Sequence, residues 1–308
     1  MSAFKRIMIG LDLSDMDQVL IRYTAFLCQR LQPEVVYFIT VQSDLDVPDE
    51  VRAEFPEMQV PLDEHLRARM QEEIEKWFPA SAGMEVHIEV VEGSPRREIL
   101  RWTHIKDVDL LILGRKDEVR GSGIIPVQLA RKISCSLLFV PERPPHTLAR
   151  VMVGSDFSDC SYAALDQALA CVDGEPEAQV WVFHSFSVPM GYYKTGKTEA
   201  QFAEIMKGHA ARHYDDFIAP VKTPSAVTLA PILAFNVQQV SPAILLYERA
   251  QREGAELMVV GARGRNAVTA LLLGSVAERL IKLGGQIPLL LAKRKHATFS
   301  FLDMIESI

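Results

Sequence analysis

The sequence predicts an α/β protein built from two copies of one layered domain, each with a parallel sheet covered by helices on both faces. Short apolar runs typical of buried strands alternate with longer amphipathic segments along the chain. The segment Arg6–Asp15 returns as Arg150–Asp159, and Asp109–Gly114 returns as Glu256–Gly261. A repeat of roughly 145 residues is a duplicated domain, because solenoid units are shorter.

Length and composition agree with two cytoplasmic domains. The 308 residues suit two domains, and 48% hydrophobic residues can supply two cores. A formal net charge of −7 predicts no nucleic-acid partner. The start of the chain has no apolar signal region, and no apolar run is long enough to predict a membrane span. The cysteines are too scattered for a CxxC site and are expected to be core residues in a reducing compartment: Cys28, Cys135, Cys160 and Cys171.

The first domain is expected over residues 1–143. Asp12 and Ser14 offer N-caps for its first helix, and Pro95 follows a Gly-Ser pair that starts another. Three prolines in Pro141–Thr147 break regular structure and mark the linker. The expected strands are residues 6–11, 35–41, 84–91, 110–113 and 136–140, and the expected helices are 16–31, 63–77, 95–104 and 126–133.

The second domain is expected over residues 147–295, in the same order. Pro231 places its third strand near an edge or a bulge, and Pro242 opens a helix. A loop rich in Gly, Tyr and Lys covers 186–198, and an amphipathic tail with no identifiable partner covers 296–308. The expected strands are 151–155, 180–185, 227–234, 257–260 and 288–292, and the expected helices are 161–171, 199–218, 242–253 and 276–283.

One stretch of the second domain has the residues of a phosphate site. The apolar run Leu257–Val260 predicts a strand buried on both faces, and Gly261 ends it. Gly261 and Gly264 leave room for the backbone to approach a ligand, while Gly274 and Ser275 precede a helical segment. The first N–H groups of a helix favour phosphate. The alternative is two loops with ordinary turn and capping glycines.

The spacing Gly-x2-Gly-x9-Gly-Ser resembles the ATP-binding signature of the universal stress proteins, and each half of the chain resembles one domain of that family. The resemblance implies two doubly wound domains of five parallel strands, in the order 3-2-1-4-5. Such a sheet binds ligands where the order reverses, between strands 1 and 4. It implies ATP as the ligand, with or without Mg²⁺. The implied site residues are Asp156, Ser158, Ser185, Gly261, Arg263, Gly264, Gly274, Ser275 and Val276.

Several of these residues have a plainer interpretation. Asp156 and Ser158 could instead cap the next helix. Arg263 could pair with a phosphate oxygen or be a solvated loop charge. The resemblance places Ser185 where backbone atoms meet adenine. His184 is expected to be a packed, hydrogen-bonded histidine rather than a catalytic one, because it has no evident nucleophile partner.

The first half departs from the signature. Asp117 stands where the second glycine belongs, five residues rather than nine separate it from Gly123, and Ile124 replaces the serine. An acidic side chain opposes phosphate, so one competent site per chain is expected, in the second half. The first half keeps Asp12 and Ser14, so a remnant site or a different ligand stays open there. Its basic turn could attract an anion but is more simply a solvated loop, and it contains Arg115, Lys116 and Arg120.

The resemblance implies an ATP-binding regulatory protein with little or no turnover and an unidentified protein partner. Two alternatives stay open: an adenine-nucleotide-dependent enzyme, either a slow ATPase or an adenylating enzyme, and a scaffold for another small ligand. Against an enzyme, the sequence has no P-loop and no evident paired carboxylates or Ser/His/Asp set. Family domains commonly dimerise through the last strand. The halves are therefore expected to form an intramolecular pseudo-dimer, and a homodimer would use another surface.

Overall fold

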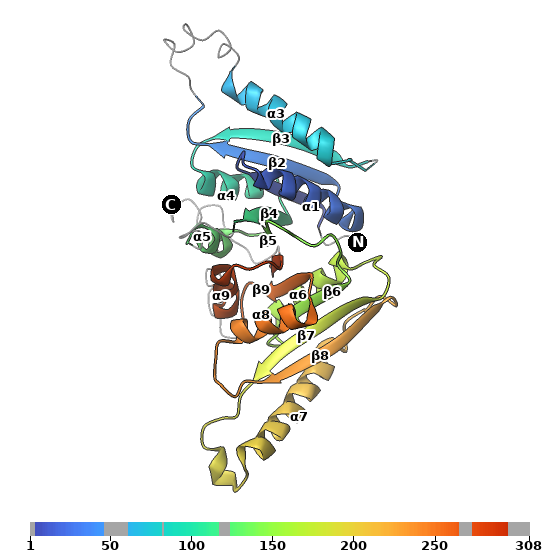
Figure 1. Ribbon diagram of the computed structural model, residues 1–308, viewed down its shortest axis with the longest axis vertical. Coiled ribbons are helices and arrows are strands. Elements are labelled where there is room, and N and C mark those ends of the chain that lie inside the picture. The colour runs from blue at the N-terminus through green and yellow to red at the C-terminus, as the bar shows by residue number, and fades with distance from the viewer. Residues whose placement is uncertain (1–3, 46–60, 82, 117–123, 265–272, 295–308) are drawn as a thin grey trace. The chain divides into compact units, whose positions relative to one another are not determined.

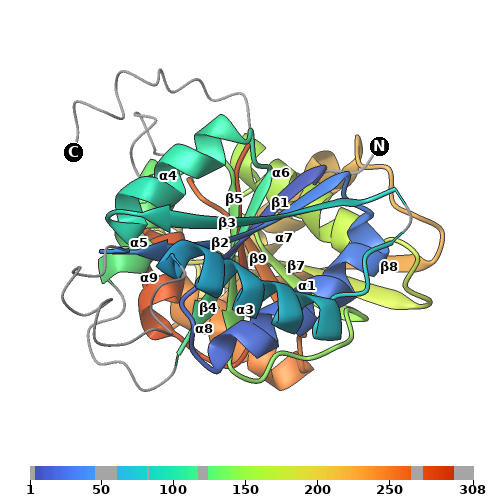
Figure 2. The same ribbon diagram turned by 90° about the horizontal axis from the view of Figure 1, so that it is seen from above.

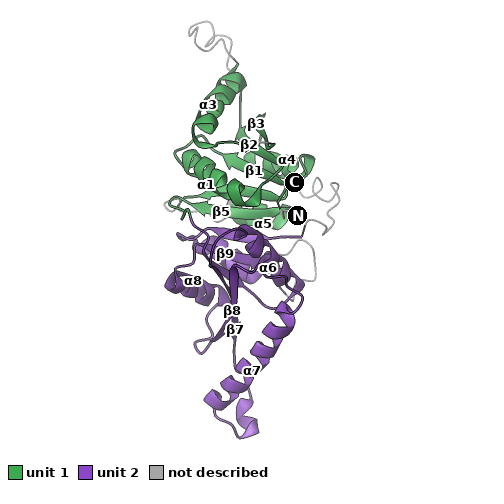
Figure 3. Ribbon diagram, turned by 90° about the vertical axis from the view of Figure 1, so that its right-hand side faces the viewer, with its two compact units in different colours: residues 1–146, 295–308 green, residues 147–294 purple. Residues whose placement is uncertain are grey.

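The computed structural model describes residues 4–45, 61–81, 83–116, 124–264 and 273–294. These residues form two compact units, shown in Figure 3. Unit 1 runs to His146, and unit 2 covers Thr147–Arg294. The division falls within the proline-containing segment that the sequence marks as a linker. The first-half loop 117–123, with Asp117, Arg120 and Gly123, and the expected tail lie outside the described residues.

Unit 1 is a five-stranded parallel sheet with the neighbour order β3-β2-β1-β4-β5. Helix α1 packs on β1 and β4, α3 packs on β3, and α4 packs on β2, so helices cover the sheet (Figures 1 and 2). The strands are β1 (Arg6–Leu11), β2 (Val35–Gln42), β3 (Glu85–Glu92), β4 (Leu110–Arg115) and β5 (Ser136–Pro141). The helices are α1 (Met16–Leu31), α3 (Leu62–Trp77), α4 (Pro95–Ile105) and α5 (Ile124–Lys132).

Unit 2 repeats this topology with the neighbour order β8-β7-β6-β9-β10, again all parallel. Helices α6 and α7 pack on strands of the sheet, and α8 packs against α9. The strands are β6 (Arg150–Gly154), β7 (Ala178–Phe186), β8 (Val227–Phe235), β9 (Leu257–Gly261) and β10 (Leu289–Ala292). The helices are α6 (Asp159–Cys171), α7 (Glu199–Ile218), α8 (Pro242–Glu253) and α9 (Ser275–Leu283). Both units therefore confirm the predicted order 3-2-1-4-5.

The local signals explain most element boundaries. Pro231 lies in β8, the outermost strand of unit 2. A proline is tolerated in such a strand because it has no backbone N–H to donate to a second neighbouring strand. Pro242 is the first residue of α8. Thr198 and Gln201 form a capping box that starts α7 at the predicted residue. The expected loop 186–198 includes a 3₁₀ turn, Tyr192–Thr195.

The predicted N-caps of α1 are wrong. The cap position is Asp15, and its side chain makes no capping hydrogen bond. Leu13 has a positive φ of 62°, and this turn directs the N–H groups of Asp12 and Leu13 to the carboxylate of Asp17. Ser14 still contributes locally, since its hydroxyl accepts the N–H of Met16. The turn separates Asp12 from the helix start, and its carboxylate is available for other contacts.

The cores are apolar, and most cysteines belong to them. Residues 257–260 of β9 are buried, as predicted for a strand covered on both faces. Burial raises the pKa of the Cys28 and Cys171 thiols to about 12. Cys135 is also buried, whereas Cys160 is only half-buried, so it does not fit the expectation of a core residue. None of the helices among the described residues is long and apolar enough to span a bilayer.

Candidate functional site

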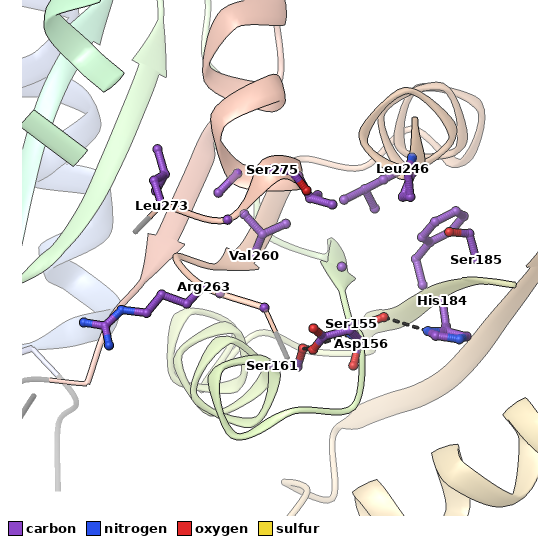
Figure 4. A pocket seen from close by; sticks show the side chains of 18 residues that line it. Ser155, Asp156, Ser161, His184, Ser185, Leu246, Val260, Arg263, Leu273 and Ser275 are labelled. Atoms are coloured by element: carbon purple, nitrogen blue, oxygen red, sulfur yellow. Dashed lines mark hydrogen bonds between the residues drawn. The ribbon is translucent and has the colours of Figure 1, made fainter. Parts of the chain in front are cut away.

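A cavity opens in unit 2 where the strand order reverses. β6 and β9 are neighbours, and the chain leaves them at Gly154 and Gly261 toward α6 and α9. The cavity encloses about 510 Å³ and is drawn in Figure 4. Every predicted site residue except Ser158 lines it. The lining residues are Gly154, Ser155, Asp156, Ser161, Phe183, His184, Ser185, Pro242, Leu246, Val260, Gly261, Arg263, Gly264, Leu273, Gly274, Ser275, Val276 and Ala277.

The glycines of the motif lie where the backbone of one segment approaches another. A Cβ at Gly261 would lie 2.8 Å from the carbonyl oxygen of Cys160, so a side chain there requires backbone movement. A Cβ at Gly264 would lie 3.0 Å from Oδ2 of Asp156. The N–H of Gly274 donates to the carbonyl of Ala262 at 2.8 Å, joining the two described ends of the loop. The glycine spacing therefore shapes the cavity through close backbone packing.

Helix α9 begins at the cavity wall. Its N-cap, Gly274, has no side chain, so the first N–H groups receive no side-chain cap. Ser275 and Val276 form the first turn, and both line the cavity. These N–H groups and the hydroxyl of Ser275 can donate to an anion, and the helix dipole adds partial positive charge.

The carboxylate of Asp156 is held by local hydrogen bonds on the floor of the cavity. Its Oδ1 accepts the hydroxyl of Ser161 at 2.7 Å and the N–H of Ser158 at 3.1 Å. Ser158 itself is the N-cap of α6, and its hydroxyl accepts the N–H of Ser161 at 3.3 Å. The capping interpretation therefore holds for Ser158, while Asp156 is oriented toward the cavity without capping the helix.

The far wall of the cavity comes from β7 and α8. Phe183 of β7 and Leu246 of α8 give it an apolar surface, and Figure 4 shows Ser185 and Leu246 on the same side. The ring of His184 donates from Nδ1 to the carbonyl of Ser155 at 2.9 Å. That ring packs against Phe157 with centroids 4.4 Å apart. His184 is thus a packed, hydrogen-bonded histidine, as expected.

Arg263 borders the cavity, but its guanidinium extends away from Asp156 and Ser161 (Figure 4). Pairing of Arg263 with a phosphate therefore stays a prediction that requires a different side-chain conformation. Among the described residues, no group of three or more His, Cys, Asp or Glu side chains could hold a metal ion.

Sequence reasoning missed two kinds of cavity residue. The apolar lining of Phe183, Pro242 and Leu246 has the same sequence pattern as core, so nothing distinguished it beforehand. Ser161 lies one helical turn beyond Ser158, and a lone serine carries no motif. The signal that could have found it is the repeat, because the equivalent residue of the first half is Asp17.

The equivalent crevice of unit 1 is arranged differently. Lys116, equivalent to Arg263, pairs with Asp12 at 2.8 Å between Nζ and Oδ2. Burial alone would raise the pKa of Asp12, but hydrogen bonds and charge from Lys116 and Ser14 hold that pKa below its usual value. Burial, with the charge of Asp12 adding to it, raises the pKa of Asp17 to about 6. The predicted remnant residues Asp12 and Ser14 are therefore engaged within unit 1.

The fold and crevice define a tandem, doubly wound α/β protein with a cavity at the switch point of its second unit. A sequence model of the Universal stress protein family matches residues 3–141 and 147–293. The chain therefore belongs to the universal stress protein family, in a tandem arrangement. A search of curated proteins found no match.

Solved structures share this fold at low sequence identity. A functionally unknown protein from Pseudomonas aeruginosa PAO1 is 13% identical, with a TM-score of 0.58 over 99% of this chain and 96% of that one. A putative universal stress protein from Pseudomonas aeruginosa UCBPP-PA14 is 14% identical, with a TM-score of 0.59 over 99% and 96%. A universal stress protein from Archaeoglobus fulgidus DSM 4304 is 17% identical, with a TM-score of 0.59 over 94% and 98%.

Proposed function

We propose that this universal stress protein binds ATP, or a closely related adenine nucleotide, in the crevice of unit 2 and acts as a regulatory protein with little or no turnover. The observation that carries the proposal is the division of one cavity into two chemical halves. Gly261, Gly264 and the first turn of α9, whose N-cap provides no side-chain hydrogen bond, form an end that can donate backbone N–H groups. Phe183 and Leu246 form an apolar end beside Ser185.

Each half suits one part of the nucleotide. The uncapped N–H groups of α9 and the hydroxyl of Ser275 suit phosphate oxygens. The apolar wall suits the faces of a purine, and polar backbone near Ser185 suits its edge. A volume of about 510 Å³ falls within the ~300–1,000 Å³ typical of small-molecule sites.

Asp156 would contact a ribose hydroxyl or a phosphate-bound Mg²⁺. Mg²⁺ is commonly held by one or two carboxylates together with substrate phosphates and water, so a single protein carboxylate is enough. Little or no turnover is proposed because the family resemblance implies it, and the hydrolysis rate tests it. A cytoplasmic location, a protein partner that reads the bound state and pseudo-dimer packing of the halves are further parts of the proposal.

The test measures the identity of the ligand, the number of binding sites per chain and the rate of ATP hydrolysis. Mass spectrometry of the purified protein should find a co-purified adenine nucleotide, and calorimetric titration with ATP and Mg²⁺ should give one site per chain. Hydrolysis should remain below the ~1 s⁻¹ lower end of ordinary enzyme rates. Two equivalent sites would contradict the assignment to unit 2, and no binding would reject nucleotide as the ligand.

A further inference from the structure

The hydroxyl of Ser161 contacts both the backbone and the side chain of Asp156. It donates to Oδ1 of the carboxylate at 2.7 Å and accepts the N–H of the same residue at 3.0 Å. Ser161 is only 4% exposed. Its position is also fixed by the start of α6, because its own backbone N–H donates to the hydroxyl of the N-cap Ser158. One buried hydroxyl therefore fixes both the turn and the rotamer of the acid.

This arrangement decides which oxygen of Asp156 faces the ligand crevice. Oδ1 accepts two hydrogen bonds from the α6 side, from Ser161 and Ser158. Oδ2 lies toward the glycine loop, 3.0 Å from the place a Cβ would take at Gly264. Figure 4 shows Asp156 and Ser161 side by side on the cavity floor. A hydrogen bond from a neutral hydroxyl also stabilises the charged form of the carboxylate.

Unit 1 shows the same turn with a different residue at this position. Asp17 accepts the N–H groups of Asp12 and Leu13 at 3.0 and 2.9 Å, so it reproduces the backbone contact. An ionised carboxylate has no proton to donate, so it cannot hold the side chain of Asp12. Oδ2 of Asp12 instead pairs with Lys116 at 2.8 Å. Both acids accept a neutral hydroxyl, from Ser14 in unit 1 and from Ser161 in unit 2, and the acid of unit 1 is in addition paired with a cation of its own chain.

We infer that Ser161 is a positioning residue of the ligand site: it orients the charged carboxylate of Asp156 toward the bound nucleotide or its metal ion. The inference rests on the proposed nucleotide function of unit 2. It assigns a role to a residue outside the glycine signature. Because Ser161 acts through Asp156, its removal should have no effect on ligand affinity once Asp156 is gone.

The first measurement needs no ligand. The pKa of the Asp156 carboxyl group, followed by carboxyl-carbon NMR, should rise by about one unit in Ser161→Ala, because the charged form loses a donor. Ser161→Cys, nearly the same size but a weak donor, should show a rise in the same direction. Circular dichroism should show both variants folded.

The second measurement is a double-mutant cycle in ATP affinity with Mg²⁺ present. Ser161→Ala should weaken binding about tenfold in the wild-type background and not at all in the Asp156→Ala background. The matched control is Asp17→Ser in unit 1, which should leave ATP affinity unchanged. An unchanged Asp156 pKa, or an equal loss of affinity in both backgrounds, would overturn the role of Ser161 alone. Wild-type protein that binds no ATP would overturn the proposed function and this role together.

Discussion

Replacing Gly264 with aspartate tests where the phosphates lie. The change copies Asp117, the residue that stands at the equivalent place in the first half. The new Cβ would lie 3.0 Å from Oδ2 of Asp156, so the new carboxylate would lie within a few ångströms of the existing one. The variant therefore adds negative charge at the part of the crevice assigned to phosphate.

Coulomb's law sets the size of the effect. Two unit charges ~4 Å apart repel by about 1 kcal/mol in water and by about 4 kcal/mol at the effective dielectric of a protein surface. A single added carboxylate facing a phosphate should therefore weaken ATP binding between about fivefold and about 1,000-fold. Gly264→Ala adds the Cβ without charge, and it should weaken binding less because Asp156 needs to shift by only a few tenths of an ångström.

Calorimetric titration at two salt concentrations separates charge from shape. The loss in Gly264→Asp relative to Gly264→Ala should shrink at higher salt, because screening acts on the charge term. Gly208→Asp is the matched control, since the same charge change occurs on α7 where a Cβ would meet no atom within 4 Å. Gly264→Asp protein that is folded and binds ATP with wild-type affinity would refute the phosphate assignment.

Two further predictions concern unit 1 and the assembly of the halves. Folded Asp17 keeps its proton up to about pH 6, whereas the unfolded chain loses it near pH 3.8. As the pH rises between these two values, the free energy of unfolding of the wild type relative to Asp17→Asn should fall by on the order of 1 kcal/mol, after allowance for solvent screening. Above pH 6 the difference should stay level. Denaturant titrations across pH 4–8 would show this difference, and a pH-independent difference would contradict the raised pKa of Asp17. Packing of the two halves as a pseudo-dimer predicts that lengthening the linker within 141–147 with Gly and Ser leaves the radius of gyration nearly unchanged in small-angle scattering; a clear expansion would indicate independent domains.

The architecture was predictable because it depends on patterns that the sequence displays directly. Apolar runs such as Leu257–Val260 are long enough for strands and are bounded by glycine or polar residues, and the duplication provides each pattern twice. Strand and helix ends moved by one to a few residues, as with β7, which extends to Ala178–Phe186. Boundaries depend on which backbone groups find partners in neighbouring elements, and the sequence does not state those partners.

The lining of the candidate site was predictable where the family signature names a residue, and most directly where backbone geometry restricts residue type. The close packing at Gly261 and Gly264 tolerates no ordinary side chain without movement, so spacing alone marks those positions. Leu246 and Phe183 could not be found this way, because a cavity wall and a core require the same apolar side chains. The failed expectation at Asp12 has a related cause: the positive φ of Leu13, unusual for a leucine, turns the chain before the helix begins.

The two crevices differ most in how the acid at the end of the first strand is satisfied. Asp12 has a lysine partner at 2.8 Å and a second carboxylate, Asp17, bound to its N–H. Asp156 has a hydroxyl donor from Ser161, and the equivalent basic side chain, Arg263, extends away from it. A carboxylate already paired with an ammonium group attracts a phosphate-bound metal ion weakly, because much of its charge is compensated. Asp12 also accepts the hydroxyl of Ser14, so the difference lies in its ion pair with Lys116, and loss of nucleotide binding in unit 1 would require no change of fold.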